Sequence, residues 1–171
     1  MSYKIKLKSI STFIFDVDGV LTDGKVYLFR DEHIRAIHSK DKYAIQYAAK
    51  MGYSIFVITG GSTVSVQQTL MGLGAKDVRL KSSNKISVYE DLKKKHGFTD
   101  DEVLYMGDDL PDYRVMQQVG VSTCPQDAAT EIRQIASYQS PFLGGGGCVR
   151  DIIEQTLRVQ GKWFGELSHE W

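Results

Sequence analysis

Short apolar runs alternate with helix-like segments along most of the chain. Runs rich in aromatic or β-branched residues predict strands at 13–15, 53–58, 78–80, 103–106 and 121–123. Helices are predicted at 42–51, 62–73, 84–96, 111–119 and 149–159. Strands that alternate with helices in this way favour right-handed crossovers. The pattern therefore predicts an α/β fold, with a doubly wound parallel sheet covered by helices on both faces.

One segment interrupts this alternation between the first strand and the first helix. Its apolar stretches 25–29 and 34–38 flank a polar turn, Arg30–His33, and predict a β-hairpin that projects from the sheet over about 25–38. Isolated hairpins are only marginally stable, so this one needs a partner surface. The C-terminal tail, 162–171, is unusually aromatic, and it either docks on a neighbouring subunit or frays.

The composition narrows the class of protein. A chain of 171 residues suits a single domain, 1–171. It carries 21 Lys and Arg against 21 Asp and Glu, and this balance argues against a nucleic-acid partner. Because it has no long apolar run and no signal-peptide core, we expect no membrane partner and a cytoplasmic location. Cys124 and Cys148 are too few for a disulfide framework or a zinc site, although one disulfide between them stays open.

Polar side chains follow three of the predicted strands. Asp16 and Asp18 come directly after the first strand and, separated by Val17, would point the same way. Such carboxylates repel each other unless a cation or a shared proton compensates, so the pair could bind a hard metal ion or divide nucleophile and proton-transfer duties. Thr59 and Asp108 follow two further strands. The carboxyl ends of parallel strands meet at one edge, where we expect these motifs to converge on a ligand site.

Four segments resemble, in order and context, the four motifs of the haloacid dehalogenase superfamily: Asp16–Thr22, Thr59-Gly60, Lys85 and Gly107–Asp109. The resemblance implies a Rossmann-like core and Mg²⁺-dependent hydrolysis of a phosphate monoester. The large cap domains of this superfamily are inserted after the first motif or between the second and third. Here those gaps hold only a hairpin with a helix, and a helix with a strand, so we expect no cap domain. An open site would take its substrate selection from elsewhere, such as a neighbouring subunit.

The resemblance implies separate roles for the three motif carboxylates. Asp16 would attack phosphorus in line to form an aspartyl-phosphate. Asp18 would protonate the leaving sugar oxygen and then deprotonate the water that hydrolyses the intermediate. The Asp16 carboxylate, the Asp18 backbone carbonyl and Asp108 would hold Mg²⁺, which neutralises the repulsion between carboxylate and phosphate.

The resemblance also implies supporting roles around the phosphoryl group. Thr59, with Gly60, would bind that group, and Lys85 would balance its charge and that of Asp16. Asp109 and Asp112 would orient metal-bound waters or Lys85. Taken singly, these residues have ordinary alternatives: Thr59 could be a turn residue, Lys85 a solvated lysine, and Asp112 a stabiliser of a helix start.

A second resemblance is more specific. Residues 15–24, Gly107–Leu110 and Gly145–Arg150 are similar to those of the capless 3-deoxy-D-manno-octulosonate 8-phosphate phosphatases. This family implies a cytoplasmic, Mg²⁺-dependent homotetramer, active in making the inner-core sugar of lipopolysaccharide, and a phosphorylated sugar-acid substrate. Arg150 matches a late arginine of the family and could bind a substrate anion, or it could instead form an ion pair at a helix start.

Three positions depart from the family pattern. Gly61 and Thr69 stand where arginines are common, and Lys81 stands where a glycine is common, with Arg79 close by. Either the positive charge has moved to Arg79 and Lys81, or the substrate differs. Relatives that act on nine-carbon 2-keto-3-deoxy sugar acid 9-phosphates tend to carry Glu at position 61, so Gly61 favours the eight-carbon substrate.

A catalytically inert oligomerisation module of the same fold is the third alternative. Such a module would have little reason to keep the five motif residues together, and this chain keeps them all: Asp16, Asp18, Thr59, Lys85 and Asp108.

Overall fold

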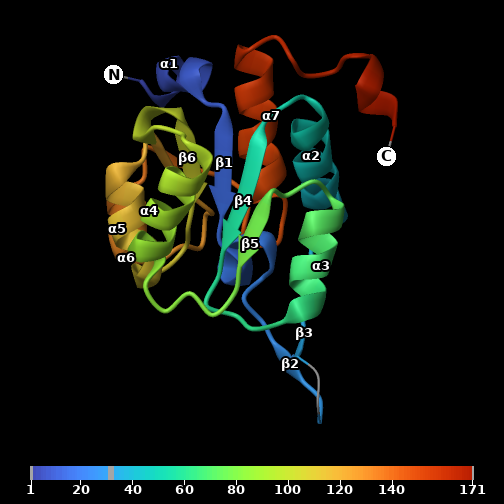
Figure 1. The fold of residues 1–171 in the computed structure, drawn as a ribbon, viewed down its shortest axis with the longest axis vertical. Coiled ribbons are helices and arrows are strands. Elements are labelled where there is room, and N and C mark those ends of the chain that lie inside the picture. The colour runs from blue at the N-terminus through green and yellow to red at the C-terminus, as the bar shows by residue number, and fades with distance from the viewer. Residues whose placement is uncertain (1, 31–32, 171) are drawn as a thin grey trace.

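A six-stranded parallel sheet forms the centre of the protein in the computed structural model, which describes residues 2–30 and 33–170 (Figure 1). The strand order is β5-β4-β1-β6-β7-β8, and every neighbouring pair is parallel. The strands are β1 (Thr12–Phe15), β4 (Ser54–Ile58), β5 (Asp77–Arg79), β6 (Val103–Met106), β7 (Val121–Cys124) and β8 (Tyr138–Gln139). The predicted doubly wound sheet is confirmed, with β8 as an additional edge strand.

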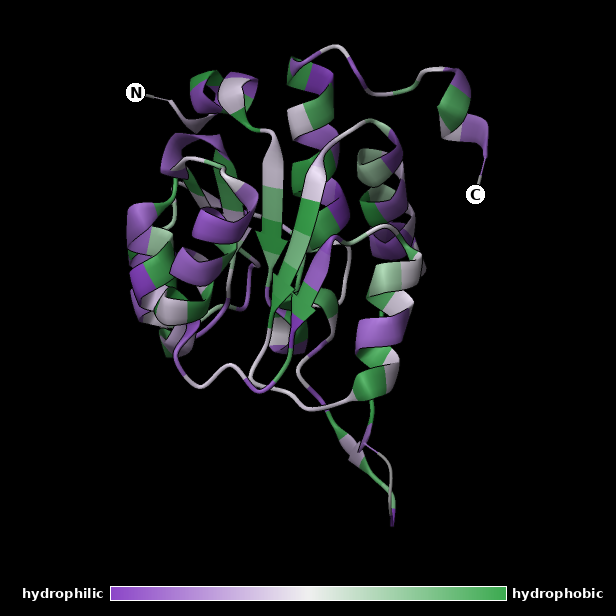
Figure 2. Cartoon of the chain, in the orientation of Figure 1, coloured by the Kyte–Doolittle hydropathy of each residue, from purple (hydrophilic) through white to green (hydrophobic). Residues whose placement is uncertain are grey.

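Helices cover both faces of this sheet (Figure 1). One layer holds α2 (Ser39–Lys50), α3 (Val64–Gly72) and α7 (Cys148–Val159). The other holds α4 (Lys85–His96), α5 (Tyr113–Gln118) and α6 (Thr130–Ile135). Side chains of β1 alternate between the two layers: Phe13 and Phe15 join the core beneath α2 and α7, whereas Ile14 joins the core beneath α4 and α5. Figure 2 shows the hydrophobic strands enclosed between helices with hydrophilic outer faces.

Short helices complete the fold. They are α1 (Tyr3–Lys6), η1 (Leu7–Ser9), η2 (Val17–Leu21), η3 (Asp100–Glu102), η4 (Leu110–Asp112) and η5 (Glu166–His169). The helix predicted at 111–119 is divided between η4 and α5, because the Asp109 side chain accepts from the backbone N–H of Leu110 and starts a tight turn there. None of the helices in the described ranges is both long and apolar enough to cross a bilayer.

The predicted hairpin is present. Its strands β2 (Tyr27–Leu28) and β3 (His33–Ile34) are antiparallel and extend past the carboxyl ends of the sheet strands (Figure 1). Two residues of the predicted turn, Asp31 and Glu32, lie outside the described residues. Four apolar side chains of the hairpin, Tyr27, Leu28, Phe29 and Ile34, are exposed, up to 74% for Leu28, and belong to neither core of the described chain. Ile37, at its base, packs against the core beneath α2 and α7.

The C-terminal tail packs on its own chain. The ring of Trp163 meets that of Tyr47 of α2 edge-on at 5.2 Å, and the Tyr43 hydroxyl donates to the carbonyl of Ser168. Fraying is therefore wrong for the tail up to this point, because α2 supplies an aromatic surface for it. Trp171 lies outside the described residues.

Candidate active site

The predicted motif residues meet in one cavity at the carboxyl edge of the sheet. This cavity has a volume of about 330 Å³, and its walls include nine of the residues singled out in the sequence: Asp16, Asp18, Thr59, Gly60, Gly61, Lys85, Asp108, Asp109 and Asp112. Asp16 follows β1, Thr59 follows β4 and Asp108 follows β6, one residue beyond Gly107. These are neighbouring strands in the sheet, so their ends bring the three motifs together.

The chain turns sharply after β1 and brings two motif carboxylates close together. Asp16 accepts a 2.6 Å hydrogen bond from the backbone N–H of Val17. Gly19 adopts a φ of +88°, and a Cβ on this residue would lie 2.0 Å from Oδ2 of Asp108. Only glycine suits this position, both for its left-handed backbone and for the close approach of Asp108. The glycine of the first motif therefore makes room for the carboxylate of the last.

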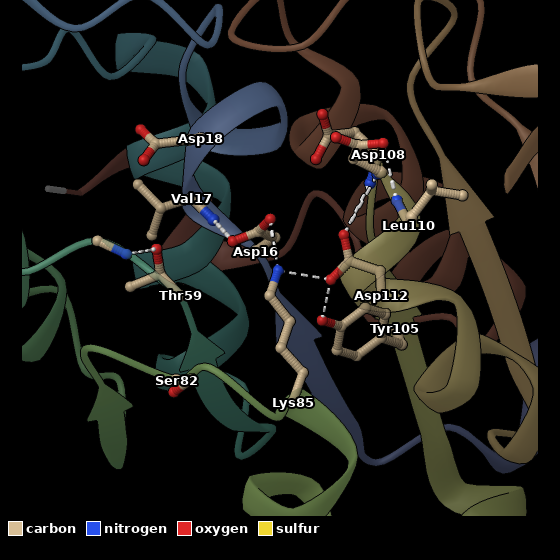
Figure 3. Close-up of polar contacts among 12 residues, drawn as sticks. Asp16, Val17, Asp18, Thr59, Ser82, Lys85, Tyr105, Asp108, Leu110 and Asp112 are labelled. Carbon is tan, nitrogen blue, oxygen red and sulfur yellow. Dashed lines mark hydrogen bonds and ion pairs between the residues drawn. The ribbon is translucent and has the colours of Figure 1, made fainter.

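Lys85 is the buried cation of the site. Its side chain is 4% exposed, and its ammonium lies 2.7 Å from Oδ2 of Asp16 and 2.7 Å from Oδ1 of Asp112 (Figure 3). Asp112 also accepts from the Tyr105 hydroxyl at 2.5 Å and from the backbone N–H of Asp108 at 3.2 Å. Since both oxygens of Asp112 already accept hydrogen bonds, this carboxylate holds Lys85 in place beside Asp16.

The three carboxylates carry more negative charge than Lys85 can balance. Asp16, Asp108 and Asp112 each place an oxygen within 4.8 Å of the others. Burial, followed by the charge of Asp112, raises the pKa of Asp16 to about 7, although Lys85 opposes this. Burial, followed by the charges of Asp16 and Asp112, likewise raises the pKa of Asp108 to about 7. Oδ1 of Asp108 is buried without a hydrogen-bond partner in the described structure. Hard oxygen donors with uncompensated charge fit a divalent cation such as Mg²⁺.

The side chain of Asp18 is held by an arginine that belongs to none of the sequence motifs. Arg35 donates from Nε to Oδ1 of Asp18 at 2.6 Å and from Nη2 to Oδ2 at 3.0 Å. Arg35 follows β3 at the base of the hairpin, and its side chain is only 7% exposed. The one signal in the sequence was a charged residue between Ile34 and Ala36, in an otherwise apolar stretch.

The remaining motif residues have local partners. Thr59 is buried, and its hydroxyl accepts from the backbone N–H of Gly61 at 3.1 Å. Ser82, which the sequence did not indicate, also lines the cavity and donates its backbone N–H to the carbonyl of Thr59. Asp109 is exposed and caps η4. Thr59 and Ser82 lie on the side of the cavity opposite Asp112 (Figure 3).

Arg150 is the one predicted site residue that does not line this cavity. It lies on α7, where Nε donates to Glu154 at 2.8 Å and the guanidinium lies 4.5 Å from the ring of Trp163. It borders a separate cavity of about 430 Å³. These surroundings match the ion-pair alternative, so contact with a substrate at Asp16 would require a neighbouring subunit.

Known proteins are similar to this chain in sequence and in fold. A family profile of haloacid dehalogenase-like hydrolases matches residues 71–147. The 3-deoxy-D-manno-octulosonate 8-phosphate phosphatase KdsC of Escherichia coli is 35% identical over 158 residues, which are 92% of this chain and 84% of that protein.

Solved structures agree with this relationship. A probable YrbI family phosphatase from Pseudomonas syringae superposes with a TM-score of 0.92 at 31% identity, covering 98% of this chain and 95% of that one. The 3-deoxy-D-manno-octulosonate 8-phosphate phosphatase from Moraxella catarrhalis, solved with magnesium, phosphate and KDO, superposes with a TM-score of 0.90 at 28% identity, covering 94% and 92%. The chain therefore belongs to the haloacid dehalogenase-like hydrolases, and within them to the family of the 3-deoxy-D-manno-octulosonate 8-phosphate phosphatases.

Proposed function

We propose that this protein is a Mg²⁺-dependent phosphatase that hydrolyses 3-deoxy-D-manno-octulosonate 8-phosphate to the free sugar acid and phosphate. The observation that carries the proposal is the buried cluster of Asp16, Lys85 and Asp108 beside Asp18, in one open cavity at the sheet edge. The KdsC relatives act on this substrate by name, and the chain matches them over 92% of its length. This activity serves the synthesis of the lipopolysaccharide inner-core sugar, and we place it in the cytoplasm.

Each of the two chemical steps forms one bond at phosphorus, breaks another and moves one proton. A carboxylate oxygen of Asp16 attacks phosphorus, the bond from phosphorus to the sugar oxygen breaks, and Asp18 gives its proton to that leaving oxygen. Asp18 then takes a proton from a water molecule. The water oxygen attacks phosphorus of the aspartyl-phosphate, and the bond to Asp16 breaks to release phosphate. Thr59, the backbone of Gly60, and Lys85 bind the phosphoryl oxygens.

The residues present fit a magnesium ion. Asp16, the backbone carbonyl of Asp18, and Asp108 with its unpartnered oxygen would hold it. Asp112 is left out of this set because each of its oxygens already accepts from two donors, Lys85 and Tyr105 on one and two backbone N–H groups on the other. Each oxygen of Asp16 accepts from one donor only. When bound, Mg²⁺ neutralises negative charge on the carboxylates and the phosphate.

Magnesium binding is expected to depend on pH. The raised pKa values of Asp16 and Asp108, about 7 against 3.8, mean that the metal-free folded protein binds more protons than the unfolded chain between these values. Stability without metal should therefore fall as the pH rises from about 4 to about 7. Because the metal displaces these protons, its affinity should fall roughly tenfold for each displaced proton and each pH unit below about 7.

Thermal unfolding with and without MgCl₂ tests this expectation. The stabilisation by Mg²⁺ should be larger at about pH 8 than at about pH 5.5. Asp108→Asn should lose most of the response at both values, whereas Asp91→Asn, an exposed carboxylate on α4, should keep it. An equal response of the unmodified protein at both pH values would contradict the proposed ligand set.

Phosphate release from two sugar acid phosphates tests the identity of the substrate. We expect Mg²⁺-dependent hydrolysis of 3-deoxy-D-manno-octulosonate 8-phosphate to be faster than hydrolysis of a nine-carbon 2-keto-3-deoxy sugar acid 9-phosphate. The absence of a glutamate at Gly61 supports this order. Faster turnover of the nine-carbon ester would replace the proposed substrate, and no turnover of either ester would support the inert oligomerisation module.

We also propose that the protein is a homotetramer whose active sites are completed by neighbouring subunits. The exposed apolar hairpin supports this assembly, since Tyr27, Leu28, Phe29 and Ile34 present a hydrophobic surface with no partner in the described chain. Figure 2 shows hydrophobic residues along this hairpin, away from the body of the protein. Hairpins that project beside the catalytic edge could pair around a symmetry axis.

Light scattering after gel filtration checks the assembly. The unmodified protein should have the mass of four chains, and Leu28→Glu combined with Phe29→Glu should lower it, because the hairpin surface would then carry charges. Ile5→Glu is the control, as Ile5 is also apolar and exposed but lies on α1, at the opposite end of the sheet (Figure 1). A monomeric unmodified protein would contradict the proposal.

A further inference from the structure

Arg35 joins three segments that are distant in the sequence. Besides the two hydrogen bonds to Asp18, it donates from Nη1 to the hydroxyl of Thr63 at 2.6 Å. Asp18 belongs to the turn after β1, Thr63 precedes α3, and Arg35 itself belongs to the hairpin. A nearly buried guanidinium is therefore positioned between the hairpin and the catalytic edge.

A second cavity begins at this arginine. It has a volume of about 540 Å³ and lies between the hairpin and the first turns of α3. Arg35 is the only Lys or Arg among the described residues that line it, beside His33, and four hydroxyl side chains line it as well: Ser62, Thr63, Ser65 and Thr69. A concave surface with several hydroxyls and one guanidinium is chemically suited to a polyhydroxylated carboxylate. Arg35 lines this second cavity and Asp18 lines the catalytic one, so their ion pair connects the two.

Gly61 gives the guanidinium its access to the catalytic cavity. A Cβ at this position would lie 3.3 Å from Nη2 of Arg35, 3.4 Å from Oγ1 of Thr59 and 3.5 Å from Oδ2 of Asp18. Any longer side chain would compete with Arg35 for the space between Thr59 and Asp18. The absence of a side chain at position 61 thus leaves that space to the cation supplied by the hairpin.

The ion pair conflicts with the proton transfer assigned to Asp18. Both carboxylate oxygens of Asp18 accept from Arg35, one through Nε and the other through Nη2. An oxygen that accepts from a guanidinium in this way is not oriented to give a proton to a leaving group. Asp18 can take part in catalysis only after Arg35 has found another anion.

We propose that Arg35 determines specificity by binding the carboxylate of the sugar acid, and that this exchange releases Asp18 for proton transfer. The inference rests on the proposed function and deepens it, because the sugar part of the substrate occupies the hydroxyl-lined cavity beside Arg35. A guanidinium binds a carboxylate through two parallel hydrogen bonds, so the substrate carboxylate is a matched competitor for Asp18. A phosphate ester without a carboxylate leaves the ion pair between Arg35 and Asp18 intact, and it is therefore hydrolysed slowly. Recognition of a remote group is thereby coupled to the chemical step.

The test compares two phosphate esters. We take the ratio of kcat/KM for 3-deoxy-D-manno-octulosonate 8-phosphate to kcat/KM for mannose 6-phosphate, which lacks a carboxylate. Arg35→Gln should lower this ratio on the order of 10- to 100-fold, the effect of one lost charge-assisted bidentate contact. Arg35→Lys keeps a cation and should restore most of the ratio. Arg79→Gln is the matched control, because Arg79 pairs with Asp77 at 3.0 Å and lines neither cavity.

Two results would overturn the role of Arg35. In the first, Arg35→Gln slows hydrolysis of both esters by the same factor, which would mean that Arg35 only supports Asp18 structurally. In the second, the ratio of the two kcat/KM values changes with Arg79→Gln instead. Titration calorimetry with the free sugar acid adds a measurement without turnover, in which Arg35→Gln should weaken binding by a similar factor while Arg79→Gln does not. If the unmodified protein hydrolyses neither ester with Mg²⁺ yet binds the sugar acid through Arg35, the proposed function fails and the inference about recognition stands.

Discussion

Asp16→Asn is expected to abolish Mg²⁺-dependent phosphate release, with a loss of kcat on the order of 10⁴-fold or more. The asparagine amide has nearly the same shape as the carboxylate, and its oxygen can still accept the hydrogen bond from Val17 that Asp16 accepts. It has no negative charge, however, and cannot form the bond to phosphorus. The substitution would also remove one anionic partner of Lys85 and one proposed metal ligand.

Two measurements separate the loss of the nucleophile from a loss of structure. Rapid acid quenching with a ³²P-labelled ester should trap labelled protein for the unmodified enzyme and none for Asp16→Asn. The melting temperature shows whether the variant is folded, and Asp91→Asn, an exposed carboxylate on α4, should keep full activity. Phosphate release by a folded Asp16→Asn at more than about a tenth of the normal rate would contradict the proposed covalent mechanism.

The central strands could be predicted because each is buried on both faces. Residues 13–15 and 103–106 are continuous apolar runs, and in the structure all of these positions are buried. The edge strand β8 and the short helix α6 gave no such signal. Tyr138–Gln139 is half polar and pairs with one neighbour only, while a single residue of α6, Ile132, is fully buried. Edges of a fold bury too few side chains to leave a periodic pattern.

The meeting of the motifs could also be anticipated, because parallel strands end at one edge. What the sequence could not give is which side chains touch within that edge. Asp112 contacts Lys85 across 27 positions of the chain, and Arg35 contacts Asp18 across 17. The second contact depends on how the hairpin leaves the sheet, which no local pattern specifies. Arg150 shows the opposite error. The sequence motif placed this residue in the site, but its side chain stacks on Trp163 of the tail, away from the catalytic cavity.

Lys85→Met is expected to destabilise the protein and to impair catalysis together. Burial alone would lower the pKa of Lys85, but the charges of Asp16 and Asp112 raise it above its ordinary value, so the ammonium stays charged in the site. Methionine fills a similar volume without the charge. Removing one partner of a buried ion pair costs about 3–5 kcal/mol, since the other charges remain desolvated and unpaired. The variant should be least affected at low pH, where Asp16 and Asp108 take up protons.

Chemical denaturation at two pH values measures the loss of stability, and Lys95→Met on the same helix is the matched control. Lys95 is 59% exposed and pairs with Asp77 at 3.0 Å, so its loss should cost less than about 1 kcal/mol. In the folded fraction of Lys85→Met, kcat should fall roughly 10²- to 10³-fold, as expected when one preorganised charge facing the phosphoryl group is removed. Equal destabilisation by both substitutions would mean that Lys85 does not balance the buried charges of Asp16 and Asp112. The negative charge of the site would then be balanced by the metal ion alone.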